Sequence, residues 1–158
     1  DRNEFMSSYD VTVIGGGASQ ELFKLKSQQI KNLFYLPFQP KEVLPYSLAS
    51  ADISLVILGD GTEGISMPSK LYYSMASGSA ILSISSGEND LKFIVNKFMC
   101  GINVENGDLE GFVNAVIKFN DDKDFLDRCK LNARDAAKNH FSSEIVLPQY
   151  INILKKQK

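Results

Sequence analysis

The sequence predicts an α/β fold, a Rossmann-like parallel sheet flanked by helices and followed by a helical C-terminal third. Up to residue 104, short β-branched strands of about five residues alternate with helical patterns of about ten, which is typical of βαβ units and a parallel sheet. Residues 53–58 are apolar on both faces of the predicted strand, as expected where helices cover both sides of the sheet. Beyond residue 108 only helical periodicity remains.

Strands are predicted at residues 10–15, 32–36, 53–58, 80–84 and 101–104. Helices are predicted at residues 19–30, 40–51, 68–77, 90–98, 109–119, 121–139 and 142–155. Ser19 is placed to cap the first of these helices. Pro45 should bend the second helix or split it into two turns, because proline cannot donate the helical hydrogen bond. Crossovers between the parallel strands should be right-handed.

Length and charge restrict the classes of function. The chain has 158 residues with 44% hydrophobic and 23% charged, which is typical of one globular domain and not of a disordered protein. The net charge is −2 and the isoelectric point is about 5.4, so nucleic acid is not an expected partner and the chain has no general attraction to anionic membranes. No apolar run approaches the ~20 residues of a membrane span, and no signal peptide is visible.

Chemically reactive residue types are scarce. Cys100 and Cys129 cannot build a disulfide framework, and with the single His140 they are too few for a zinc site. We expect reduced, buried thiols in a cytoplasmic protein and read His140 as a packing or capping residue. The chain begins without methionine, so we expect residues 1–158 to be a single domain taken from a longer two-domain protein.

Three loops follow the carboxyl ends of strands, where open parallel sheets bind ligands: residues 15–17, 37–40 and 59–67. The glycine turn at 15–17 would let a ligand approach the backbone closely and would expose amides near a helix start. It lacks the full GxGxxG spacing, since Gln20 interrupts it. A tight turn with a purely structural role is therefore equally open.

The third loop leads into a helix that begins near Pro68. The backbone amides of Gly64, Ile65 and Ser66 could point at one oxyanion there, since the start of a helix favours negative charge. Lys70 could add a side-chain donor to a phosphate. The alternative is a helix start with no ligand.

Glu63 lies next to these amides in the sequence. A carboxylate near a bound anion is useful if it accepts hydrogen bonds from hydroxyl groups such as those of a sugar. Other acidic residues have simpler interpretations. Residues 121–124 and the pair Glu88 and Asp90 should start helices, although a metal at the first group and a sugar at the second stay open.

Residues 63–72 (EGISMPSKLY) and 75–82 (MASGSAIL) resemble the donor-binding half of retaining glycosyltransferases of the GT-B fold, and are most similar to glycosyltransferase family 4, also called group 1. Segments that agree with the same family in the same order are residues 13–17, 32–40, 50–56, 101–108, 132–134 and 140–142. The resemblance covers nearly the whole chain and implies the C-terminal half of a GT-B fold.

The resemblance implies that the chain binds a nucleotide-diphosphate sugar as a substrate and needs no cofactor or metal. The diphosphate would meet the amides of Gly64, Ile65 and Ser66. Glu63 would face the donor sugar, and Lys70 would place charge near the phosphates. The nucleotide could be of the UDP or the GDP type.

The resemblance also implies base contacts from Leu36 and Phe38, with Gly16 and Gly17 lining the same crevice. The acceptor would be bound by an amino-terminal domain that these 158 residues do not contain. The implied setting is bacterial surface polysaccharide or glycolipid synthesis in the cytoplasm, with the full-length protein at the inner face of the membrane.

Some residues depart from the family pattern. Tyr73 stands where a second glutamate binds the ribose hydroxyls, Ser74 where a tyrosine follows, and Ala80 where a proline precedes the next strand. A tyrosine can offer a hydrogen bond or a stacking surface, but it cannot accept two hydroxyls as a carboxylate does. Nothing before Gly15 matches the family's arginine and lysine pair, so we expect no turnover by this chain alone.

Two alternatives remain at this stage. A GT-B-like module that kept the fold and lost its catalytic function would explain Tyr73. A flavodoxin-like receiver or cofactor domain would fit the strand and helix alternation, but the acidic cluster that a receiver needs after its first strand is missing.

Overall fold

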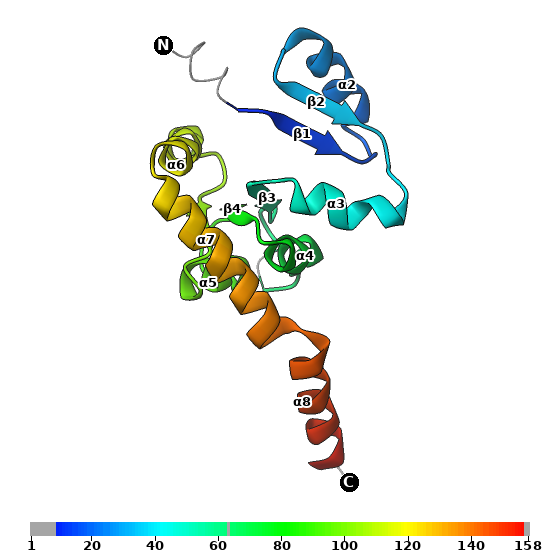
Figure 1. The fold of residues 1–158 in the computed structure, drawn as a ribbon, viewed down its shortest axis with the longest axis vertical. Helices are drawn as coiled ribbons and strands as arrows, with labels where there is room; N and C mark the ends of the chain where they lie inside the picture. Colours follow the sequence, from blue (N-terminus) through cyan, green and yellow to red (C-terminus); the bar gives the residue numbers. More distant parts are fainter. Residues whose placement is uncertain (1–8, 63, 157–158) are drawn as a thin grey trace. The chain divides into compact units, whose positions relative to one another are not determined.

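The computed structural model describes residues 9–62 and 64–156 and divides the chain into two compact units, Asp1–Leu44 and Pro45–Lys158. Figure 1 shows the chain coloured along its sequence. The predicted α/β class with parallel strands and flanking helices is confirmed. The five described strands form two sheets, one of two strands and one of three.

The first unit is a strand-helix-strand arrangement made of β1 (Val11–Ile14), α2 (Gln20–Gln29) and β2 (Leu33–Leu36), followed by the short 3₁₀ helix η1 (Lys41–Val43). The two strands are parallel, with Val11 opposite Leu33 and Ile14 opposite Leu36. Their carboxyl ends therefore lie side by side. The turn of residues 15–17 and the segment that begins at residue 37 both leave from this edge.

The prediction that the Ser19 side chain caps α2 is wrong. Ser19 is the N-cap residue, but its side chain accepts no capping hydrogen bond. Its backbone, at φ −93° and ψ 7°, is outside the extended conformation in which an N-cap side chain reaches back to the helix. Backbone groups begin the helix instead, with the Gln20 N–H donating to the Gly17 carbonyl at 3.0 Å.

The predicted helix at 40–51 is split, as expected from Pro45. The short η1 ends at Val43, and α3 (Leu44–Ala49) begins directly after it. Pro45 is the second residue of α3, within the first turn, where a missing N–H donor costs little.

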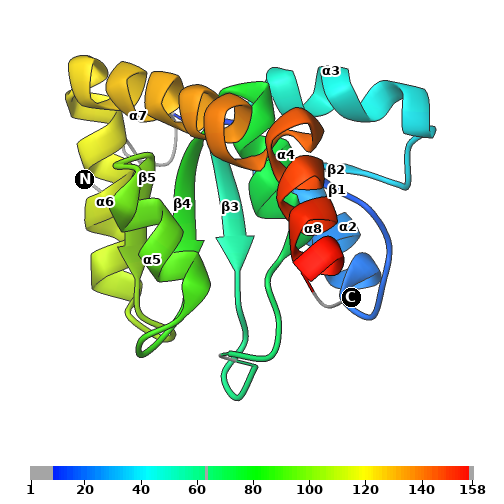
Figure 2. The same cartoon turned by 90° about the horizontal axis from the view of Figure 1, so that it is seen from below.

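The second unit holds a parallel sheet in the order β3 (Ile53–Ile57), β4 (Ala80–Ile84) and β5 (Gly101–Val104). The connecting helices are α4 (Ser69–Ser77) and α5 (Asp90–Lys97), and Figure 2 shows them beside the strands. The C-terminal helices are α6 (Leu109–Asp121), α7 (Lys123–Ala136) and α8 (Ser143–Lys156).

Both faces of β4 are buried. Ile81 belongs to one apolar cluster, with residues of β3, α4, α5 and α7. Ala80 and Leu82 belong to a second cluster, with residues of β5, α6 and α7. This alternation is expected of a strand covered on both sides. Cys100 lies in the first cluster and Cys129 in the second, so the predicted burial of both thiols is confirmed.

The helical third differs in detail from its prediction. Asp122 separates α6 from α7 as N-cap, accepting a 2.9 Å hydrogen bond from the Phe125 N–H. A π-helical segment, Ala137–Phe141, joins α7 to α8. Its wide turn brings the Phe141 ring to 5.0 Å from Tyr72, and the His140 ring to 4.9 Å from Phe98. His140, for which a packing or capping role is predicted, is exposed, and its ring lies against Phe98.

Candidate functional site

In the first unit, the glycine turn is held against the end of β2. The Gly15 N–H donates to the Leu36 carbonyl at 3.1 Å, and the Tyr35 hydroxyl donates to the Gly15 carbonyl at 2.8 Å. Gly15 and Gly17 have φ values of 141° and 133°, which side chains rarely adopt. The turn therefore depends on glycine at both positions and has a fixed place at the edge of the sheet.

Phe38 lies beside this turn. A β-carbon placed on Gly16 would be 3.5 Å from a carbon of the Phe38 ring, although the ring is 82% exposed. Four predicted nucleotide-binding residues, Gly16, Gly17, Leu36 and Phe38, thus lie at one edge of this unit. An exposed aromatic ring next to an open backbone turn is a surface on which a planar base can stack.

In the second unit, the candidate phosphate site lies in the loop between β3 and α4, residues 58–68, called the β3 loop below. The Thr62 carbonyl accepts hydrogen bonds from the Ile65 N–H at 3.2 Å and the Ser66 N–H at 3.1 Å. Gly64, at φ 73°, lies within this turn. Two of the three predicted phosphate donors are therefore used inside the loop, and a bound phosphate would have to replace the Thr62 carbonyl. Glu63 lies outside the described residues.

The helix that follows begins one residue later than predicted. Pro68 is the N-cap of α4 and its carbonyl accepts from the Leu71 N–H at 3.0 Å. Lys70 is exposed in the first turn. The protein around its amino group desolvates it and lowers its pKa. Among the described residues it has no ion-pair partner.

Tyr72 and Tyr73 are neighbours in α4 but differ in exposure. Tyr72 is partly buried and packs on Phe141, and burial raises its pKa. Tyr73 is 58% exposed. Of the three residues that depart from the family pattern, Tyr73 is therefore the one open to solvent, within two turns of the start of α4.

The sequence reasoning missed the side chains that connect the loops of this unit. Asn106, after β5, donates from its side-chain nitrogen to Asp60 Oδ1 at 2.6 Å and to the Leu58 carbonyl at 3.3 Å. The neighbouring Glu105 accepts from the Gly87 N–H at 3.3 Å. The signal available in the sequence was the Asn106-Gly107 pair directly after a strand, which is typical of a tight turn.

Glu88 and Asp90 lie at the start of a helix, which is the first of the two roles predicted for them. Asp90 is the first residue of α5, and Glu88 forms a 3.3 Å ion pair with Lys92. The helix is capped by the residue between them, Asn89, which accepts from the Lys92 N–H at 2.9 Å. The possible contact of Glu88 and Asp90 with a sugar stays untested.

The known proteins to which this chain is similar include glycosyltransferases. The chain is 32% identical over 92 residues to the probable glycosyltransferase WbjE of Pseudomonas aeruginosa, a match that covers 57% of this chain and 23% of that protein. Its structure is similar to WaaG, a glycosyltransferase involved in lipopolysaccharide biosynthesis, with a TM-score of 0.67 and 16% identity over 94% of this chain and 40% of WaaG.

Two structures of Anabaena HepE are also similar, both at 16% identity. The complex with UDP has a TM-score of 0.75 over 94% of this chain and 41% of HepE. The complex with UDP-glucose has a TM-score of 0.72 over 97% of this chain and 43% of HepE. This chain has the fold of part of WaaG and of part of HepE. No family model matches the chain.

The resemblance to glycosyltransferases and the α/β fold predicted from the alternation of strands and helices are thereby confirmed, while membership of family 4 stays a prediction. The chain spans less than half the length of each of these relatives. In residues 9–62 and 64–156, no helix is both long and apolar enough to cross a bilayer.

A pocket in the second unit lies away from the strand ends. It has a volume of about 690 Å³ and is lined by Asn114, Ile117, Lys118, Asp121, Asp122, Lys123 and Asp124. These residues lie where α6 meets α7, and Figure 2 shows β3 and β4 pointing away from α7. Ligands of parallel sheets bind at the other edge, so this pocket is not the candidate donor site.

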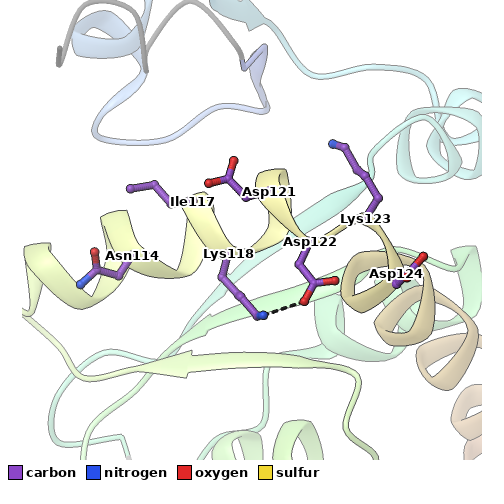
Figure 3. A pocket seen from close by; sticks show the side chains of 7 residues that line it. All are labelled: Asn114, Ile117, Lys118, Asp121, Asp122, Lys123 and Asp124. Carbon is purple, nitrogen blue, oxygen red and sulfur yellow. Dashed lines mark hydrogen bonds and ion pairs between the residues drawn. The ribbon is translucent and has the colours of Figure 1, made fainter.

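The acidic side chains that line this pocket do not point toward one common position. Figure 3 shows Lys118 and Asp122 turned toward each other, with Asp121 directed away from them. Lys118 and Asp122 form a 2.6 Å ion pair, and this hydrogen bond from Lys118 is the largest cause of the lowered pKa of Asp122. No group of three or more acidic, histidine or cysteine side chains in the described part of the chain could hold a metal ion.

Proposed function

We propose that this chain is the donor-binding domain of a retaining glycosyltransferase, which moves a sugar from a nucleotide-diphosphate sugar to an acceptor hydroxyl. The observation that carries the proposal is the fold, which HepE shares in complexes with UDP and with UDP-glucose. The ordered motif match in residues 63–82 supports it independently.

The phosphate-binding role is assigned to the β3 loop and the start of α4. The amides of Gly64, Ile65 and Ser66 would hold the diphosphate, and the Lys70 amino group would add positive charge beside it. Stabilising the charge that develops on the leaving diphosphate is the main catalytic contribution these groups can make. Glu63 would orient the donor sugar.

The base-binding role is assigned to the first unit. Phe38 offers an exposed ring in contact range of Gly16, and the space around the α-carbon of Gly17 is open. Leu36 adds an apolar contact at the end of β2. Base–aromatic stacking contributes about 1–3 kcal/mol and is tolerant of the base, so these residues support a UDP or a GDP donor alike.

We further propose that an amino-terminal domain binds the acceptor, since the solved neighbours extend well beyond the part that this chain matches.

The proposed role is bacterial surface polysaccharide or glycolipid synthesis, in keeping with the name of WaaG. The proposed location is the cytoplasm, with the full-length protein at the inner face of the membrane. NMR of the product made by that protein would test retention of the anomeric configuration.

The second candidate is a GT-B-like binding module without transferase activity. Tyr73 favours it, because a tyrosine at the ribose position lacks the carboxylate that binds two hydroxyls. The loss of one charged hydrogen bond costs about 1.5–3 kcal/mol, or one to two decades of affinity. Such a site would be weakened rather than removed.

A thermal-shift titration of the chain with UDP, GDP, ADP and their sugar conjugates tests the proposal. A ligand present at 100 times its Kd stabilises the folded state by about 2.7 kcal/mol, which raises Tm by several degrees for a chain of this size. Lys70→Ala should reduce the shift, and Lys138→Ala, an exposed lysine in the segment before α8, should leave it unchanged. No shift with any nucleotide at millimolar concentration would contradict donor binding by this chain.

A further inference from the structure

We infer that Asn106 is a positioning residue for the β3 loop, and that it sets the affinity for the donor diphosphate through Asp60. The inference rests on the proposed function for the identity of the ligand. The contact itself is a donor–acceptor pair between loops that follow two different strands, with the Asn106 side-chain nitrogen 2.6 Å from Asp60 Oδ1.

Asn106 is the tether of the β3 loop, that is, the residue whose side chain connects this loop to another segment. Among the hydrogen bonds of the described residues, the one to Asp60 is the only one that joins residues 59–62 or 64–66 to another segment. The others, at Thr62, Ile65 and Ser66, are internal to the loop. The second hydrogen bond of Asn106, to the Leu58 carbonyl, holds the residue at which the loop leaves β3.

The backbone around Asn106 is itself fixed. The Asp108 N–H donates to the Glu105 carbonyl at 3.2 Å, which closes a turn in which Gly107 has φ 80°. The Asn106 N–H donates to Ser86 Oγ at 3.0 Å, which ties the turn to the loop after β4. Because the turn is closed, the half-buried Asn106 side chain keeps one direction, toward the β3 loop.

The chemistry of the pair suits a positioning role. Both hydrogens of the Asn106 amide have an acceptor, and one of these acceptors is a carboxylate, which makes that hydrogen bond charge-assisted. A binding loop held in place before the ligand arrives does not lose that freedom on binding. Removing the tether should therefore weaken diphosphate binding without removing a group that touches the ligand.

The test compares the 158-residue chain with the variants Asn106→Ala, Asp60→Ala and the double variant. Asn114→Ala is the matched control, since it changes an exposed asparagine of α6 with no side-chain hydrogen bond among those described. The first readout is amide hydrogen exchange without ligand. Exchange at Thr62, Ile65 and Ser66 should rise about tenfold in Asn106→Ala, and exchange within β3, β4 and β5 should stay as in the unchanged chain.

The second readout is the Kd for UDP and for GDP by calorimetry. Asn106→Ala should raise the Kd of whichever nucleotide binds by about tenfold, the order expected for one charge-assisted hydrogen bond. Asp60→Ala should raise the Kd by no more than this, because it leaves the hydrogen bond from Asn106 to the Leu58 carbonyl in place. The double variant should be no worse than Asn106→Ala, because that variant has already lost the contact with Asp60. A second double variant, Asn106→Asp with Asp60→Asn, exchanges the two residues. It should recover part of the nucleotide affinity that is lost in Asn106→Asp alone.

Unchanged exchange at the loop in Asn106→Ala would overturn the inference, whatever the ligand results. Raised exchange with an unchanged Kd would also overturn it, since the loop position would then not control binding. If the unchanged chain binds neither nucleotide nor its sugar conjugates, the proposed function fails. The exchange results then decide by themselves whether Asn106 holds the loop.

Discussion

A β-carbon added to Gly101 would lie 1.7 Å from the carbonyl oxygen of Ile81 in the neighbouring strand. The two residues are partners in the parallel register of β4 and β5. Ile81 is also bonded to the residue before Gly101, through its N–H to the Cys100 carbonyl at 2.9 Å. The backbone of β4 thus occupies the space that any side chain at position 101 would need.

We expect Gly101→Ala to destabilise the chain by about 3 kcal/mol, the upper part of the usual range for overpacking, because backbone rather than a flexible side chain must move. Gly59→Ala is the matched control. No atom lies within 4 Å of its added β-carbon, so it should change stability by no more than about 0.5 kcal/mol. Urea unfolding of both variants measures the difference, and equal stabilities would contradict the prediction.

Two buried serines should respond in opposite directions to the same substitution. The Ser74 hydroxyl is fully buried and has no partner among the described residues. Ser79 is equally buried, but its hydroxyl donates toward the carbonyls of Leu48 and Ala51, at 3.2 and 3.0 Å. Ser74→Ala should stabilise by about 1 kcal/mol, and Ser79→Ala should destabilise by about 1–2 kcal/mol. Chemical unfolding of the two variants under identical conditions tests the signs, and a loss of stability in Ser74→Ala would show that its hydroxyl is satisfied.

The stability of the chain should fall in alkaline solution because of its two thiols. Burial raises the pKa of Cys100 from 9.0 to about 12 and that of Cys129 to about 11. The folded state therefore keeps protons that the unfolded state loses. The resulting stability is complete below pH 9 and is lost as pH rises toward 11 and 12.

The measurement is urea unfolding at pH 8 and pH 10. The double variant Cys100→Ala with Cys129→Ala should lose less stability between these two values than the unchanged chain does. Both chains share the remaining lysines and tyrosines, so the difference between them isolates the thiols. Parallel losses in the two chains would show that the thiols do not contribute.

Tyr73→Glu should strengthen nucleotide binding if the proposed site is present. The side chain is 58% exposed, so a carboxylate fits without burial, and it can accept both ribose hydroxyls. The expected decrease in Kd is about 10- to 100-fold. Tyr46→Glu, on a tyrosine of α3 that is 77% exposed, controls for the added charge. An unchanged Kd in Tyr73→Glu would favour the binding module without transferase activity.

Patterns within short stretches of the sequence were sufficient to predict most of the fold. Strand ends, the split at Pro45 and the burial of both thiols follow from residue type and spacing, because each depends on a few neighbouring residues. The cap at Ser19 failed because the residue type favours a cap while the backbone dihedral angles do not permit one. The π-helical turn at residues 137–141 packs against Tyr72 and Phe98, which are far away in the sequence.

In the candidate site, too, some features could be predicted from the sequence and others could not. Parallel strands place their carboxyl ends together, so the proximity of Gly16 and Phe38 was predictable from the order of elements. The tether between Asp60 and Asn106 joins residues 46 positions apart. No spacing rule connects these two positions, and the family motif covered the second without giving it a role.

The turn closed by the Thr62 carbonyl also affects how fast a ligand could bind. Its two hydrogen bonds, from Ile65 and Ser66, must open before those amides can reach a phosphate. The observed association rate would then stop rising with nucleotide concentration and level off at the opening rate of the turn, as in binding by conformational selection.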